Sequence, residues 1–254
     1  MILITGASSG IGEACARQFA ARGRDLILVA RRLDRLESLA RELRDQHSVQ
    51  VHCFELNVTD FKAVSELVAS QPSLFTRVDT LINNAGLGKG LDPIQSGNPE
   101  DWDVMIDTNI KGLLYVTRVI LPLMIQKKRG HLILMGSVAG RWTYPRGNVY
   151  SATKYAVKGL TESLRLDLLG TGIRVTEIAP GMVETGFSEV RLGDAEKAKA
   201  VYAGMTPLTA NDIADAVVWA EGRPQHVNIQ EIVIYPTDQA SPSVVQRKAP
   251  KDAP

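Results

Sequence analysis

The alternation of short apolar runs with longer amphipathic stretches is the feature that most constrains the fold of this chain. Each apolar run has the length of a strand, and each stretch between two runs is long enough for a helical crossover. Strands joined by helices pair in parallel, and the helices then cover both faces of the sheet. The sequence therefore predicts an α/β fold with a single doubly wound parallel sheet and helices on both faces. The seven predicted strands are residues 2–4, 25–30, 51–56, 78–82, 131–135, 173–178 and 229–235.

The first predicted strand runs into a glycine-rich turn with the spacing G-x-x-x-G-x-G, and a helical pattern follows it. A turn of this kind lets backbone N–H groups approach a pyrophosphate, and the positive end of the helix favours the anion. The sequence therefore predicts that a dinucleotide binds here, as in Rossmann-type sheets. A tight turn without a ligand is the alternative. The predicted contacts are Gly6, Ser8, Ser9, Gly10, Ile11 and Gly12.

Two arginines, Arg31 and Arg32, close the second predicted strand. In dinucleotide-binding folds the residue at this place faces the adenosine ribose, where an acid bonds the 2′-hydroxyl and a cation accommodates a 2′-phosphate. The pair therefore favours NADP over NAD. The alternative is a solvated start of a helix, although cations there interact unfavourably with the helix dipole.

Small and polar residues follow most of the other predicted strands. Because the carboxyl ends of parallel strands form the ligand crevice of an open sheet, we expect these residues to converge on one site. Asn57 is expected to face the adenine, and a purely structural turn is the alternative for residues 83–86. The candidate contacts at strand ends are Asn57, Val58, Asn83, Ala85, Gly86, Ser137, Pro180 and Gly181.

A tyrosine and a lysine, Tyr150 and Lys154, stand four residues apart and share one face of a predicted helix. A tyrosine with a pKa near ~10 is a weak base unless a positive charge stabilises its phenolate. An ammonium at ~4 Å contributes about 4 kcal/mol at an effective dielectric of ~20, enough to lower that pKa by roughly three units before desolvation. The pair is therefore a candidate for proton transfer, and ordinary helix decoration is the alternative. Asn109 lies inside another helical stretch, where an asparagine needs a positional reason.

Composition gives no whole-chain case for a charged macromolecular partner. The formal net charge is +1, which favours neither nucleic acid nor a membrane surface. No apolar run approaches the ~20 residues of a membrane span, and the first strand begins at residue 2. We expect a cytoplasmic protein with a small-molecule substrate.

Cysteine and histidine spacing predicts no metal and no disulfide. Cys15 and Cys53 form neither a C-x-x-C pair nor a ligand cluster. The four histidines have no metal-ligand spacing.

These motifs, in this order, resemble the short-chain dehydrogenase/reductase family from Thr5 to about Pro236. The resemblance implies that Tyr150 is the general acid/base and that Ser137 bonds the substrate oxygen. It implies that Lys154 lowers the pKa of Tyr150 and holds the nicotinamide ribose, while Asn109 anchors a water-linked proton relay. Val183 and Thr185 would contact the nicotinamide amide.

Within that family the chain is most similar to NADP-dependent 3-hydroxy acid dehydrogenases, which act on serine, L-allo-threonine and malonic semialdehyde. The stretches 147–150, 187–191 and 226–229 carry this similarity. The chain departs from that pattern at Asn57, where the group usually has aspartate, and at Pro145-Arg146, which replace smaller residues. The turn at 183–187 is shorter. The resemblance also implies a homotetramer.

The expected activity is hydride transfer between NADP and carbon 3 of a short 3-hydroxy acid. A carboxylate substrate calls for a cation, and Arg191 is the first candidate, with Arg146 second. A broad NADPH-dependent reductase of uncharged ketones and aldehydes is an alternative, which the apolar residues Trp142, Tyr144 and Met182 would suit. A non-catalytic NADP-binding sensor is another alternative.

The chain shows neither an internal repeat nor a linker, and its length suits one domain. We expect residues 1–240 to form one dinucleotide-binding and catalytic domain. Residues 182–206, rich in Gly, Glu, Lys and Ala, are expected to form a mobile substrate flap. The polar tail 241–254 is expected to be loose or to cross a subunit boundary.

Overall fold

The computed structural model describes residues 1–248 and contains the predicted seven-stranded parallel sheet. The strand order is β3-β2-β1-β4-β5-β6-β9, and every neighbouring pair is parallel. The predicted α/β fold class is confirmed. The strands are β1 (Ile2–Thr5), β2 (Leu26–Ala30), β3 (Val51–Glu55), β4 (Thr80–Asn83), β5 (Gly130–Met135), β6 (Ile173–Pro180) and β9 (Glu231–Ile234).

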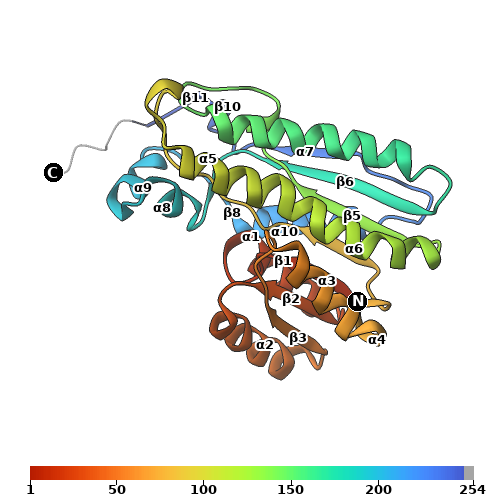
Figure 1. Cartoon of the computed structure of the whole chain (residues 1–254). Helices are drawn as coiled ribbons and strands as arrows, with labels where there is room; N and C mark the ends of the chain where they lie inside the picture. Colours follow the sequence, from red (N-terminus) through yellow and green to blue (C-terminus); the bar gives the residue numbers. More distant parts are fainter. Residues whose placement is uncertain (249–254) are drawn as a thin grey trace.

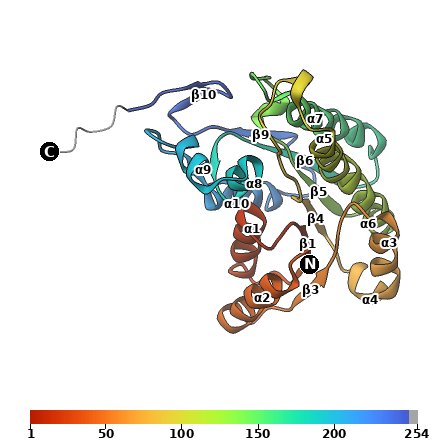
Figure 2. The same ribbon diagram turned by 60° about the vertical axis from the view of Figure 1, so that its left-hand side comes forward.

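Helices cover both faces of the sheet (Figures 1 and 2). One face carries α1 (Gly10–Ala20), α2 (Leu33–His47) and α10 (Ala210–Glu221). The other face carries α3 (Phe61–Ser70), α4 (Pro72–Phe75), α6 (Leu113–Gln126) and α7 (Asn148–Asp167). Before α6 come η1 (Ile94–Ser96), α5 (Pro99–Ile106) and the π-helical turn η2 (Asp107–Gly112), and η3 (Val138–Gly140) precedes α7.

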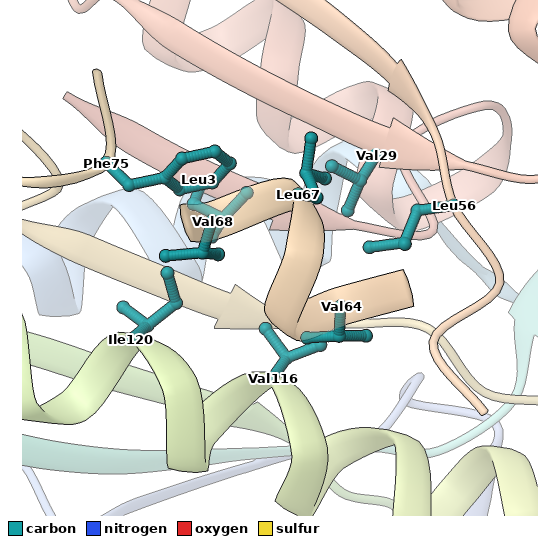
Figure 3. Close-up of a pocket in the computed structure, with 9 residues that line it drawn as sticks. All are labelled: Leu3, Val29, Leu56, Val64, Leu67, Val68, Phe75, Val116 and Ile120. Carbon is teal, nitrogen blue, oxygen red and sulfur yellow. The ribbon is translucent and has the colours of Figure 1, made fainter. Parts of the chain in front are cut away.

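The side chains of the central strand β1 alternate in direction, which explains why each face of the sheet has its own core. Successive side chains of a strand point to opposite faces. Ile2 and Ile4 therefore pack with α1, α2 and α10, whereas Leu3 packs with α3 and α6. The packing is close, because the gap drawn in Figure 3 is only about 10 Å³ and apolar side chains line it. That is a packing defect too small and too apolar to hold a ligand.

The strand order places the carboxyl ends of β1 and β4 side by side. From β1 the chain builds outward to β3 and then returns to place β4 on the other side of β1. Such a reversal opens a crevice at the carboxyl ends of the two strands, which is where open α/β sheets bind ligands.

The predicted flap is a small substructure at that end of the sheet. It contains β7 (Val183–Glu184), α8 (Phe187–Leu192) and α9 (Ala195–Val201), and β7 pairs with β8 (Leu208–Thr209). After the last sheet strand, β9, the chain forms a hairpin of β10 (Gln239–Ser241) and β11 (Val244–Val245).

The predicted tail makes defined contacts with the flap as far as residue 248. Arg247 donates hydrogen bonds to the carbonyl oxygens of Val201 and Ala203, and the Lys248 N–H donates to Gly204. This part of the tail therefore packs within its own chain. Residues 249–254 lie outside the described residues.

The continuous helical stretch Pro99–Gln126 is long and apolar enough to cross a membrane by length and composition alone. Its buried side chains, including Met105, Val116, Ile120 and Met124, pack inside the protein. These contacts are those of a core helix.

Candidate active site

The glycine-rich turn after β1 can approach a ligand closely because its glycines have no side chains. Gly6 and Gly10 have φ values of +67° and +58°, in the left-handed region that favours glycine. A Cβ at Gly6 would lie 2.9 Å from the Ala85 Cα, and one at Gly12 would lie 2.5 Å from the Gly6 oxygen. The turn leads directly into α1, so free N–H groups at that helix start can face an anion.

The side chains that hold the turn in place are Thr5 and Asn84, which the sequence analysis did not single out. The Thr5 hydroxyl accepts hydrogen bonds from the Asn84 and Ala85 N–H groups, both at 3.0 Å. The Asn84 amide donates to the Thr5 carbonyl at 3.0 Å and to the Gly6 carbonyl at 3.2 Å. Asn83, which was predicted to contact the cofactor, donates its amide to the Thr117 hydroxyl under α6 at 2.9 Å. Alternation at the strand end gives the two asparagines opposite directions.

Arg32 lies over the turn. Its Nη2 donates to the Ser8 and Ser9 hydroxyls, both at 3.0 Å. Burial lowers the pKa of Arg32, and the like charges of Arg35 and Arg31 lower it further. A phosphate would relieve that repulsion, so this end of the crevice fits the 2′-phosphate and pyrophosphate of NADP.

The next strand end contributes less side-chain chemistry. The Asn57 carboxamide oxygen accepts the Thr59 N–H at 3.2 Å, so it forms a local turn. Val58 is buried, and a Cβ at Gly112 would lie 2.7 Å from the Val58 Cγ2. Val58 therefore supports the π-helical turn η2 through packing.

Tyr150 is buried at the start of α7 with its ring 5.5 Å from the ring of Phe187. Burial raises the pKa of Tyr150 to about 12, and the nearby Tyr144 raises it too, while Ser137 and Arg191 oppose the shift. The lowered pKa expected for Tyr150 from Lys154 is therefore not found, because burial raises it instead. Desolvation outweighs the charges around the phenol, so Tyr150 is a neutral proton donor here.

Lys154 is also buried, one helical turn after Tyr150. Its Nζ donates to the Met135 carbonyl at 2.8 Å and lies 5.9 Å from the centroid of the Tyr150 ring. Burial lowers the pKa of Lys154 to about 8, partly opposed by the carboxylate of Glu177. A Cβ at Gly86 would lie 3.6 Å from this ammonium, so the end of the fourth strand's loop reaches the same site.

Asn109 sits in the π-helical turn η2 and is almost completely buried. Its carboxamide exchanges two hydrogen bonds with the backbone of Leu87, both at 2.8 Å, and donates to the Thr153 hydroxyl at 3.0 Å. Thr153 in turn donates to the Tyr150 carbonyl at 2.7 Å. The π turn, which is frequent at functional sites, thus fastens α7 to the loop after β4. The sequence analysis missed Thr153.

Ser137 follows β5, and its hydroxyl lies near the Tyr150 hydroxyl. Its hydroxyl accepts the Ala139 N–H at 3.1 Å and lies 3.4 Å from the Pro180 carbonyl. Its effect on the pKa of Tyr150 reflects the proximity of the two hydroxyl groups.

The flap begins close to the glycine-rich turn. A Cβ at Gly10 would lie 3.5 Å from Thr185, and the Val183 carbonyl accepts the Tyr202 hydroxyl at 2.8 Å. The Gly181 N–H donates to the Ile234 carbonyl at 2.7 Å, which ties the start of the flap to the sheet edge. Residues predicted to hold the nicotinamide end are thus placed beside those predicted to hold phosphates.

The two candidate anion anchors differ in position. Arg191 reaches from α8 toward Tyr150, with its Cζ 5.1 Å from that ring's centroid. Its Nη1 donates to the Tyr144 hydroxyl at 2.7 Å, and its Nε donates to the Gly90 carbonyl at 3.2 Å. Arg146 is exposed on the loop before α7, with a φ of +65°.

Within residues 1–248 the structure shows no group of three or more histidine, cysteine, aspartate or glutamate side chains that could hold a metal ion. A buried phenol, a buried lysine, a hydroxyl and an arginine can together bind an oxygen atom, exchange its proton and attract an anion.

Comparisons with known proteins agree with this geometry. A family profile described as short chain dehydrogenase matches residues 1–195. The chain is 48% identical over 242 residues to "Sulfoacetaldehyde reductase 2" of Chromohalobacter salexigens, covering 94% of this chain and 95% of that protein. It is 46% identical over 242 residues to "NADP-dependent 3-hydroxy acid dehydrogenase YdfG" of Salmonella typhi, covering 94% and 96%.

Among solved structures, the chain resembles "The Closed form of serine dehydrogenase complexed with NADP+" with a TM-score of 0.89. The two are 43% identical, and the match covers 94% of this chain and 96% of that one.

Proposed function

The chain belongs to the short-chain dehydrogenase/reductase family of oxidoreductases, and we propose that it transfers a hydride between NADP and carbon 3 of a short 3-hydroxy acid. Serine, allo-threonine and the 3-hydroxypropionate/malonic semialdehyde pair represent this substrate class. One observation carries the proposal: the Arg191 guanidinium lies beside the phenol of Tyr150.

The cofactor assignment follows from the crevice itself. The glycine-rich turn leaves room for a pyrophosphate, and Arg32 stands where the adenosine 2′-phosphate of NADP would need a cation. Bound NADP would supply the hydride acceptor or donor at its nicotinamide. Val183 and Thr185 would hold the nicotinamide amide, and Lys154 would hold its ribose.

The catalytic side chains have separable tasks in this proposal. Ser137 would orient the substrate oxygen by a hydrogen bond. Tyr150, a neutral phenol because of its raised pKa, would donate its proton to a carbonyl oxygen in the reductive direction. Asn109 would anchor the water-linked path by which that proton is replaced.

The position of Arg191 supports a substrate with an anionic head two bonds from the reacting carbon. A guanidinium binds a carboxylate through two parallel hydrogen bonds, and its contacts with Tyr144 and Gly90 fix its direction. An anion bound there would place a carbon of the same short chain near Tyr150. Arg146 lacks such support.

Sulfoacetaldehyde is a second candidate substrate, favoured by the relatives that carry its name. It is the sulfonate analogue of malonic semialdehyde, with the sulfur in place of the carboxyl carbon. The distance from the anionic head to the aldehyde is therefore similar. Arg191 could serve either head group.

The test compares anionic and uncharged substrates of similar length in both directions. We expect NADPH oxidation with malonic semialdehyde or sulfoacetaldehyde, and NADP reduction with 3-hydroxypropionate or serine, to exceed the rates with propanal and 1-propanol. In Arg191→Met, kcat/KM for the anionic substrates should fall about 100-fold, since a lost hydrogen-bonded ion pair is worth roughly 3 kcal/mol. The rates with propanal should change little.

Arg146→Met is the matched control and should keep both activities. If Arg191→Met leaves the ratio of anionic to uncharged activity unchanged, the enzyme is a broad carbonyl reductase instead. NADP binding without turnover of any carbonyl would favour a sensor.

We also propose a cytoplasmic location and assembly into a homo-oligomer. Exposed apolar side chains support the second point: Leu166 and Leu169 at the end of α7 are 78% and 86% exposed. Isolated apolar residues are common on surfaces, but these two are only three residues apart in the chain.

A further inference from the structure

A polar pocket lies at the amino ends of the sheet strands, whereas the crevice lies at their carboxyl ends. The pocket has a volume of about 450 Å³ and is lined at the amino ends of β4, β5 and β6, beside the end of α10. Thr80, His131 and Arg174 each contribute from one of these strands. The volume lies in the range of small-molecule sites, roughly 300–1,000 Å³.

Cations outnumber anions around this pocket. Four arginines line it, against one aspartate and one glutamate. Both carboxylates already have cationic partners, since Glu221 accepts from Arg24 at 2.8 Å and Asp79 lies 3.4 Å from Lys127. Asp79 also pairs with the N-terminal ammonium at 2.9 Å.

Of the other three arginines, Arg223 lies over the Trp219 ring and donates to the Trp219 carbonyl. Arg129 and Arg174 remain, and neither forms a salt bridge within residues 1–248. Arg174 is 8% exposed and uses its Nη atoms to donate to the carbonyls of Ala220 and Glu221. Burial lowers the pKa of Arg174; the charge of Glu221 opposes this, and that of Arg129 adds to it. An anion between the two guanidinium groups would relieve their repulsion.

Two buried nitrogen atoms of the lining residues have no hydrogen-bond partner among residues 1–248: Nε of Arg174 and Nδ1 of His131. Buried polar atoms are almost always hydrogen-bonded, so each calls for a partner. Arg174 Nε–H can only donate. A bound acceptor would satisfy it.

The hydrogen bonds around His131 fix what its free nitrogen needs. Its Nε2 lies 2.7 Å from the Thr176 hydroxyl, and that hydroxyl donates to the Ile229 carbonyl at 2.6 Å. A hydroxyl has one proton, so Thr176 must accept from His131 Nε2–H. Burial lowers the pKa of His131 to about 3, so the ring is neutral and Nδ1 carries a lone pair. Nδ1 of His131 can therefore accept a hydrogen bond from an N–H or O–H group.

We propose that this pocket binds a small oxyanion that carries an O–H group, of the phosphate or phosphate-monoester class. The oxyanion would accept from Arg174 Nε and from the exposed Arg129, and its O–H would donate to His131 Nδ1. This arrangement pairs both free nitrogens and neutralises the unpaired arginines. Nothing in it involves the catalytic residues, so the pocket is a separate site.

The experiment measures the melting temperature of the NADP-saturated enzyme, in which the phosphate subsites of the crevice are already filled. Inorganic phosphate is added near pH 7 at constant ionic strength, and sulfate is the paired probe because it carries no O–H at this pH. We expect a saturable rise of roughly 5 °C with phosphate at a hundredfold excess over its Kd. Sulfate should give a clearly smaller rise.

Arg129→Gln should lose most of the phosphate response, and Arg174→Lys should lose it too, because lysine has a methylene group where arginine has the Nε–H donor. Each response is measured against the same variant without phosphate, so a lower starting stability does not obscure it. Arg41→Gln on α2, an exposed arginine outside the pocket, is the matched control and should respond as the wild type does.

Three results would overturn the proposal. One is the absence of any saturable phosphate response in the wild type. A full response in Arg129→Gln would place the phosphate elsewhere. Equal responses to phosphate and sulfate would remove the need for an O–H donor at His131.

Discussion

Lys154 is buried, and within residues 1–248 its Nζ donates one hydrogen bond, to the Met135 carbonyl. Its pKa falls from 10.5 to about 8, and the pKa of the neighbouring Tyr150 rises to about 12. Burial is the main cause of both shifts, and it favours the uncharged forms of Tyr150 and Lys154. Burying the charged lysine therefore lowers the free energy of unfolding.

Lys154→Met should therefore make the protein more stable and inactive. The depressed pKa corresponds to about 3 kcal/mol at neutral pH, and loss of the bond to Met135 offsets roughly 1 kcal/mol of the gain. Below pH 8 the wild type bears this penalty in full. The penalty is the cost of burying the charged lysine, and it declines to zero as pH rises from 8 to 10.5, because the folded lysine loses its proton near pH 8 and the unfolded one only near pH 10.5.

Urea unfolding of the two proteins at pH 7 and at pH 10.5 tests this. The expected advantage of Lys154→Met is about 2 kcal/mol at pH 7 and close to zero or negative at pH 10.5. The other titrating groups are common to both proteins and cancel in the difference. An advantage that stays constant with pH would show that packing rather than charge causes it.

At this scale, residue type and position were easier to predict than side-chain direction. The motif residues Ser137, Tyr150 and Lys154 were identifiable because few sequences place them in that order after a glycine-rich turn. Asn83 and Asn84 were not distinguishable, because a shift of one residue along a strand reverses the face that a side chain occupies. The pKa of Tyr150 depends on burial, which spacing along one helix does not reveal.

Two strand-to-helix turns meet at the adenosine end of the crevice, and their contact is a basis for cofactor choice. Arg32 at the start of α2 reaches the serines that precede α1. The double change Arg31→Ala/Arg32→Ala should weaken NADPH binding about 100-fold, because charge-assisted hydrogen bonds are worth roughly 1.5–3 kcal/mol each. NADH binding should change only a few-fold.

Fluorescence titration of both reduced cofactors measures the two Kd values. Arg35→Ala, one turn further along α2, is the control for general loss of positive charge. Equal losses for the two cofactors would mean that the arginines only shape the turn.

The order of the seven sheet strands and the helices between them followed from the sequence, because apolar residues dominate most of these strands and the helices keep their spacing. The π turn within 107–112 did not follow. The sequence places Asn109 within a helical stretch, and the structure adds that this stretch begins at Pro99 and contains one wide turn. An extra residue is invisible to periodicity when the segments on either side still bury one face each.

Across the whole molecule, the outer layer of α6 and α7 is the surface most suited to a second copy of the chain. The two helices lie side by side on one face of the sheet (Figure 1). Their exposed apolar residues include Leu114 and Ile125 on α6 and Leu166 on α7. If a second copy covers these side chains, each Å² of apolar surface removed from water contributes about 25 cal/mol to the free energy of association. A charge buried among them opposes association.

Leu114→Glu/Leu166→Glu should therefore shift the sedimentation coefficient toward that of a smaller species at the same protein concentration. The wild type is expected to sediment as a tetramer. Leu33→Glu on α2, 37% exposed, is the control and should not change the assembly. A wild type that sediments as a monomer would contradict the homo-oligomer outright.

Two features at this scale had no signature in the sequence. The pocket at the amino edge of the sheet gathers Arg24, Arg129 and Arg174, which are far apart in the chain and belong to no motif. Residues 127–129 follow the end of α6, and their position beside that pocket depends on the strand order. Contacts between the tail and the flap likewise depend on where the last strand leaves the sheet.

The π turn at Asp107–Gly112 has a consequence for how such a chain can change by insertion and deletion. A π turn accommodates one more residue than an α-helical turn would, while the helix on either side keeps its buried face. Deleting one residue here would restore a regular helix and leave Val116, Ile120 and Met124 in the core. Asn109 would no longer meet Leu87 and Thr153. Deletion of a single codon would thus spare the architecture and remove the support of the helix that carries Tyr150 and Lys154.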